Sequence, residues 1–139
     1  MNKVYETIVI LFLTSTLFAN ANTSNSKTSE LVTIVKQQQD LAKKVSKYYV
    51  ALQADLKNSK KKEKMKNSIY NFNKNHLRLI KHRDNTTLIN QKLNKVGKIW
   101  KIAYKLSENK KHSTMLITAM NDISGEMKEL RKLYNKTSN

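Results

Sequence analysis

The stretch that decides the fold is ELVTIVKQQQDLAKKVSKYYVALQADL, which spans residues 30–56. Its apolar side chains recur at intervals of three and four residues, which places them on one face of an α-helix. They are Leu31, Ile34, Val35, Leu41, Val45, Tyr48, Tyr49, Leu52 and Leu56. The sequence therefore predicts a long amphipathic helix that buries this face and turns its lysines and glutamines to solvent.

Three further amphipathic stretches follow, over about residues 63–82, 87–106 and 113–134. The apolar positions of the second are Met65, Ile69, Phe72 and Leu79 or Ile80, with His76 on the same face, and those of the third are Ile89, Val96, Ile99, Trp100, Ala103 and Leu106. Those of the fourth are Leu116, Ala119, Met120, Ile123, Met127, Leu130 and Tyr134. Asp84 and Asn85 precede the third stretch and are expected to cap it.

Few residues interrupt these patterns, because proline is absent and the only glycines are Gly97 and Gly125. Long helices joined by short turns are therefore expected, with no strands. Four such helices predict an all-α fold, an up-down-up-down antiparallel four-helix bundle over residues 30–136. An extended coiled-coil hairpin that dimerises is the alternative, because the apolar spacing is also close to a heptad repeat.

Residues 1–21 are expected to form a cleavable signal peptide. Lys3 precedes an uncharged apolar run over residues 8–18 that ends in the small residues Ala19-Asn20-Ala21. This order is typical of secretory leaders. The run is shorter than the roughly 20 residues that cross a bilayer, so a retained anchor is the lesser alternative and the mature chain should have no transmembrane helix. We expect cleavage after Ala21, export to the periplasm and a polar, disordered lead-in over residues 22–29, with Thr28 or Ser29 capping the first helix.

The charge is strongly unbalanced, with 27 lysines and arginines against 10 acidic residues and a net charge of +17. Such an excess favours anionic partners. In an up-down-up-down bundle the first and third loops share one end, which should gather the lysines of both. Of these, Lys60, Lys61, Lys62, Lys110 and Lys111 are candidates for docking on an anionic polymer or lipid, and a solvated loop cluster is the alternative.

No residue pattern indicates catalysis, a metal or a cofactor. The chain has no cysteine and no glycine-rich loop, and its histidines do not stand at metal-ligand spacing. His76 lies on the apolar face of its helix and is expected to be a hydrogen-bonded core residue. The acidic residues Asp122, Glu126 and Glu129 alternate with basic ones, which predicts a salt-bridged surface. We therefore do not expect an enzyme.

Nucleic acid is not an expected partner. The basic residues are nearly all lysines, which lack the bidentate geometry that arginine offers to bases. Most of the aromatic residues lie on or beside the apolar faces, so no stacking platform is evident.

Two sequence runs resemble the PilJ-type domain. They are QQDLAKKVSK over residues 38–47 and LNKVGKIW over residues 93–100, and the fourth helix adds Met115, Leu116, Met120, Asn121 and Tyr134. This domain is the N-terminal periplasmic region of type IV pili methyl-accepting chemotaxis transducers and is related to the sensor domain of NarX-like nitrate/nitrite kinases. The resemblance implies a periplasmic four-helix bundle that senses a small ligand.

In some relatives an arginine on the first helix contacts nitrate or nitrite at a dimer interface, and that position is occupied here by Gln39. Helical spacing offers a substitute, because Lys36, Gln39 and Lys43 form one stripe beside the apolar face. In a homodimer through the first helix, two such stripes could hold a small anion.

Transducers and kinases of this kind continue into a membrane helix and a signalling module, and we expect neither segment in this chain. We therefore expect a stand-alone sensor-type module that presents its ligand to a membrane-bound receptor or kinase in signal transduction or chemotaxis. The alternative is a basic structural or interaction protein of the envelope that docks on anionic polymer or lipid.

Overall fold

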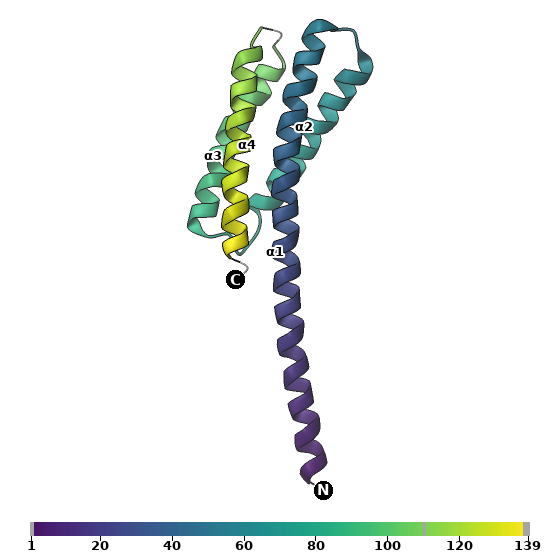
Figure 1. The fold of residues 1–139 in the computed structure, drawn as a ribbon, viewed down its shortest axis with the longest axis vertical. Coiled ribbons are helices and arrows are strands. Elements are labelled where there is room, and N and C mark those ends of the chain that lie inside the picture. The colour runs from purple at the N-terminus through teal and green to yellow at the C-terminus, as the bar shows by residue number, and fades with distance from the viewer. Residues whose placement is uncertain (1, 110, 138–139) are drawn as a thin grey trace.

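The chain folds into four α-helices, as a computed structural model shows (Figure 1). The structure describes residues 2–109 and 111–137, with side chains from Ser26 onwards. The helices are α1 (Asn2–Ala54), α2 (Ser59–Ile80), α3 (Thr87–Ser107) and α4 (Ser113–Lys136), and no strand occurs among the described residues. The predicted all-α, up-down-up-down four-helix bundle is confirmed.

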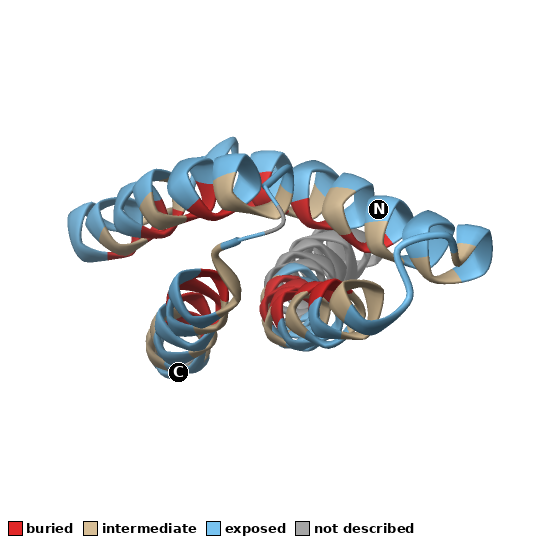
Figure 2. Cartoon of the chain, turned by 90° about the horizontal axis from the view of Figure 1, so that it is seen from above, coloured by how far each residue is buried: buried red, intermediate tan, exposed pale blue. Residues whose placement is uncertain are grey.

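The helices do not pack evenly. α1 makes extensive contacts with α4 and with α2, and α3 packs on α4, whereas α2 and α3 touch much less. Seen from above, the buried residues lie on the inner faces of the helices (Figure 2). The apolar positions that the sequence spacing singled out make up most of this core. Leu56 is an exception: it is 49% exposed, because α1 ends two residues before it.

Side chains cap two of the helices. The Asn58 side chain accepts a hydrogen bond of 2.9 Å from the backbone N–H of Lys61 and so caps α2. Thr86 caps α3, because its hydroxyl accepts a bond of 3.3 Å from the N–H of Ile89. The predicted cap at Asp84 and Asn85 is therefore wrong by one residue. Asn85 instead donates to the carbonyl of Leu79 at 2.7 Å, a bond that holds the turn before α3.

The start of the first helix also differs from the prediction. We expected a disordered lead-in over residues 22–29, with Thr28 or Ser29 as the cap, but these residues continue α1 without a break. No proline or glycine interrupts the backbone hydrogen bonds there. The hydroxyl of Thr33 also bonds back to the carbonyl of Ser29 at 2.9 Å, within a continuous helix.

The N-terminal part of α1 extends beyond the other three helices (Figure 1). It contains the expected signal peptide, whose side chains lie outside the described residues, so its cleavage stays a prediction. Of the helices in the described part of the chain, none combines the length and the apolarity that crossing a membrane requires.

Candidate functional site

The predicted anion-binding stripe lies on the surface of α1. Lys36 and Lys43 are exposed and Gln39 is half-buried, while the adjacent Gln38 is fully buried. The stripe therefore follows the boundary between core and solvent, as its spacing indicated. All three residues come from one helix, so a ligand enclosed at this stripe would need a second copy of the chain. Anion binding here stays a prediction.

The predicted lysine-rich end is formed by the two turns that the topology brings together. The Tyr49 hydroxyl, from α1, donates a hydrogen bond to the carbonyl of Asn109 in the turn between α3 and α4. Lys60, Lys61 and Lys62 follow the start of α2 at this same end, and Lys111 is exposed in the other turn. Lys110 lies outside the described residues. Docking through these lysines stays a prediction.

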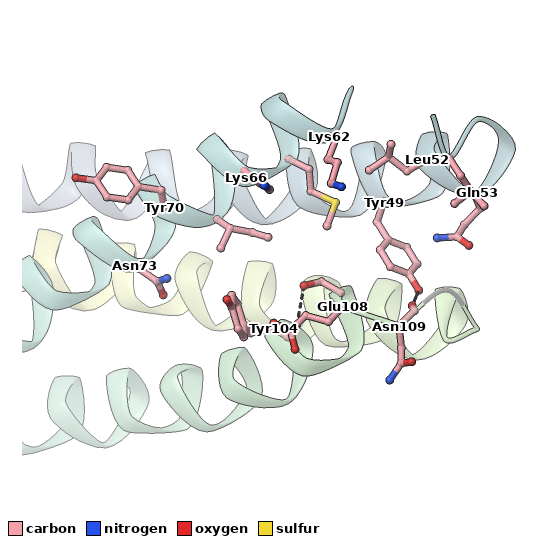
Figure 3. Close-up of a pocket in the computed structure, with 14 residues that line it drawn as sticks. Tyr49, Leu52, Gln53, Lys62, Lys66, Tyr70, Asn73, Tyr104, Glu108 and Asn109 are labelled. Carbon is pink, nitrogen blue, oxygen red and sulfur yellow. Dashed lines mark hydrogen bonds between the residues drawn. The ribbon is translucent and has the colours of Figure 1, made fainter. Parts of the chain in front are cut away.

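A groove opens at this end of the bundle (Figure 3). It has a volume of about 750 Å³ and runs between the last turns of α1, residues 62–73 of α2 and the end of α3. Its lining residues are Tyr49, Leu52, Gln53, Leu56, Lys62, Met65, Lys66, Ile69, Tyr70, Asn73, Tyr104, Ser107, Glu108 and Asn109. The groove lies between α2 and α3, which contact each other less than the other neighbouring helices do.

The groove combines an apolar floor with a basic wall. Leu52, Met65 and Ile69 are half-buried, whereas Lys62 and Lys66 are exposed on α2. The helix backbone adds to this asymmetry. α2 begins at Ser59, one turn before Lys62, and the partial positive charge at the N-terminus of a helix favours an anion.

The opposite wall is less favourable for an anion. α3 ends at Ser107, where its unpaired carbonyls carry partial negative charge, and Glu108 follows directly. An anion in the groove is therefore held best on the α2 side.

The inner end of the groove is fixed by packed aromatic rings. Asn73 lines the groove and accepts a hydrogen bond of 2.6 Å from the indole nitrogen of Trp100 on α3. Trp100 in turn stacks on Phe72, with ring centroids 3.9 Å apart. Trp100 therefore lies directly behind a groove residue.

The sequence interpretation missed this groove. It assigned Tyr49, Leu52, Met65 and Ile69 to a closed core, because they stand on the apolar faces. A signal was nevertheless present in Tyr70, which departs from the apolar stripe of α2 and is 66% exposed. Tyr104 departs likewise from the stripe of α3 and is 43% exposed.

Three polar residues are buried among the described residues, and one of them, Ser68, donates a hydrogen bond to the carbonyl of Lys64. Gln38 is completely buried and His76 is 7% exposed. Among the described residues, neither side chain has a hydrogen-bond partner. Burial lowers the pKa of His76, because the charged imidazolium would lose its hydration. The expectation of a core histidine is confirmed, but the expectation that it is hydrogen-bonded is wrong.

Two of the three acidic residues in the predicted stripe of α4, Glu126 and Glu129, form salt bridges, and the partners of Glu126 lie on another helix. Glu126 accepts hydrogen bonds from Lys92 at 3.0 Å and from Lys95 at 2.6 Å, both on α3. Glu129 pairs with Lys132 of its own helix at 2.8 Å. In the described part of the chain, no group of three or more His, Asp or Glu side chains is placed to hold a metal ion.

Comparison of the chain with models of protein families, with curated proteins and with solved structures finds no significant match. The resemblance to the PilJ-type domain therefore stays a prediction.

Proposed function

We propose that this chain is a sensor-type module, exported to the periplasm, that binds an anionic ligand in the groove between α1, α2 and α3. The observation that carries the proposal is the groove itself, in which Lys62 and Lys66 stand over an apolar floor. Its volume of about 750 Å³ falls within the range of roughly 300–1,000 Å³ that is common for small-molecule sites.

The position of the groove supports a sensing role. It lies where α2 and α3 are least packed, so a ligand there would add contacts that the empty bundle lacks. Binding would favour a closer approach of α2 to α3, because the ligand would contact both helices better in that arrangement. A difference in affinity between two arrangements is what a ligand needs to shift a conformational equilibrium. A membrane-bound receptor or kinase that contacts this end of the bundle would then distinguish the ligand-bound chain from the empty chain.

The stripe of Lys36, Gln39 and Lys43 remains a second location for a small anion, in a dimer formed through α1. The two locations can be separated by mutation, because they share no residue. Lys66→Ala removes a charge from the groove, and Lys43→Ala removes one from the stripe.

The first experiment is thermal unfolding of the full chain, at constant ionic strength, against a panel of anions that includes nitrate, nitrite, acetate and benzoate. A ligand at 100 times its Kd should raise the free energy of unfolding by about 2.7 kcal/mol. Loss of this effect in Lys66→Ala but not in Lys43→Ala would support the groove, and the reverse would support the stripe. A flat response to every anion would contradict a site for small anions.

A second candidate function is docking on an anionic polymer or lipid surface, and the exposed lysines at the start of α2 favour it. Diffuse attraction of this kind should fall steeply above about 0.15 M salt, where the Debye length is about 8 Å. The test is co-sedimentation with anionic vesicles. Docking predicts weaker sedimentation for the double variant Lys60→Glu and Lys62→Glu than for a matched control on α3, Lys98→Glu and Lys101→Glu.

A further inference from the structure

The groove is long rather than round. Along α2 it extends from Lys62 to Asn73, a separation of 11 residues. At a rise of about 1.5 Å per residue, this corresponds to about 16 Å. Figure 3 shows the lining residues spread along the helices, with Tyr70 and Asn73 toward one end and Gln53 and Asn109 toward the other.

Charged and apolar residues lie side by side along this length. Lys62 and Lys66 stand one helical turn apart on the same side of α2, close enough to share one anionic group. Met65 and Ile69 lie beside them on the groove floor, and Leu52 of α1 faces the same space. A ligand that follows the groove therefore meets positive charge on one side and apolar surface below.

A small inorganic anion or a cation would fit this arrangement less well than a ligand with both charge and apolar surface. A small inorganic anion would contact only exposed lysines, and such solvent-exposed ion pairs contribute little binding energy. It would also leave the apolar floor in water. A cation would oppose Lys62, Lys66 and the N-terminus of α2, with Glu108 as its one acidic neighbour among the lining residues.

We infer that the groove binds a single-chain amphipathic anion of the fatty-acid type, with its carboxylate between Lys62 and Lys66 and its alkyl chain on Leu52, Met65 and Ile69. The inference rests on the proposed ligand-binding function and names its ligand class. Each methylene group that the floor buries adds hydrophobic stabilisation, and the basic wall orients the head group.

The test uses the full chain and three probes. Decanoate, kept below its micelle concentration, carries both the charge and the chain. Butyrate carries the charge with a short chain, and decyltrimethylammonium carries the chain with the opposite charge. Trp100 provides the signal, because it is the only tryptophan and donates a hydrogen bond to Asn73 in the groove wall.

Decanoate should change the Trp100 fluorescence saturably and raise the unfolding midpoint. Butyrate should bind at least about 100-fold more weakly, because it lacks most of the buried methylenes. Decyltrimethylammonium should bind at least about 10-fold more weakly than decanoate, because its charge is repelled. Equal binding of the cation, or no saturable binding of decanoate, would overturn the inference.

Matched variants separate the groove from the general charge of the protein. Lys66→Glu should weaken decanoate binding at least about 10-fold. Lys74→Glu changes the net charge equally, at an exposed position of α2 outside the groove lining, and should leave binding unchanged. Leu56→Ser in the groove should weaken binding, whereas Leu88→Ser, which is similarly exposed at the start of α3, should not.

The failure of this inference can be distinguished from failure of the proposed function. If decanoate does not bind but a small anion stabilises the chain through Lys66, the ligand class is wrong and the function stands. If neither binds, both are wrong. Binding to anionic vesicles without binding to monomeric decanoate would overturn the inference in favour of surface docking.

Discussion

The imidazole of His76 lies against Gly97, and a Cβ atom at residue 97 would be only 3.2 Å from its Nε2 atom. This contact brings α2 and α3 together where their packing is otherwise thin. The absence of a side chain at residue 97 therefore makes room for a buried histidine. Gly125 differs, because a Cβ atom there would meet no atom of the described residues within 4 Å.

The two helical glycines should respond differently to substitution. Gly125→Ala is expected to stabilise the protein by about 1 kcal/mol, because alanine favours the helix more than glycine does. Gly97→Ala should stabilise less or destabilise, because His76 must move. Urea unfolding measures both. In a His76→Ala background, Gly97→Ala should stabilise the protein as much as Gly125→Ala does. Equal effects of Gly97→Ala and Gly125→Ala in the presence of His76 would contradict a tight contact between His76 and Gly97.

His76 should make stability depend on pH. Burial lowers the pKa of its imidazole below 6.5, so the unfolded chain takes up the proton at a higher pH than the folded chain does. Stability should therefore be greatest above the pKa of the unfolded imidazole, near 6.5, and should fall as the pH is lowered below it. His76→Leu should remove this fall, as measured by urea unfolding at several pH values. His82→Leu, at a half-buried surface position, is the control and should retain it.

Tyr134 joins the end of α4 to the turn between α2 and α3. Its hydroxyl donates a hydrogen bond of 2.7 Å to the side-chain oxygen of Asn85. Tyr134→Phe should cost about 1–2 kcal/mol, because a partly buried acceptor loses its donor. Tyr70→Phe is the control, since Tyr70 is 66% exposed, and a similar loss there would contradict this assignment.

The same tyrosine predicts a loss of stability in alkali. Burial raises the pKa of Tyr134 to about 12. The unfolded chain releases this proton near pH 10, so the stabilisation is complete below about pH 10 and is lost as the pH rises toward 12. Spectrophotometric titration of the folded protein should show one phenol that ionises late, and this late step should be absent in Tyr134→Phe.

Glu126 links α4 to α3 through two lysines, and its side chain is 14% exposed. Burial alone would raise its pKa, but the hydrogen bonds and charges of Lys95 and Lys92 outweigh this effect and lower it. Glu126→Gln should therefore cost about 1 kcal/mol at pH 7. The difference should shrink as the pH falls below about 4.5, where the wild-type carboxylate takes up a proton. Glu129→Gln, at a more exposed pair, should change stability less than Glu126→Gln does, because exposed ion pairs contribute little.

Much of the fold could be predicted because its causes are local. The spacing of Leu31, Val45 and Tyr49 defines a buried face within one helix, and short turns leave few topologies for four helices. The candidate site could not be predicted in the same way. Lys66 and Asn109 come from different helices, and their position at one groove depends on how far α2 diverges from α3.

The sequence by itself determined the four helices, their buried faces and the gathering of lysines at one end, because helical periodicity and chain connectivity act along the chain. Only the tertiary structure decided that Tyr49 and Ile69 line a groove, and that Gln38 and His76 are buried without a hydrogen-bond partner in the described part of the chain. Both outcomes depend on the distances between helices, which arise from packing of side chains far apart in sequence.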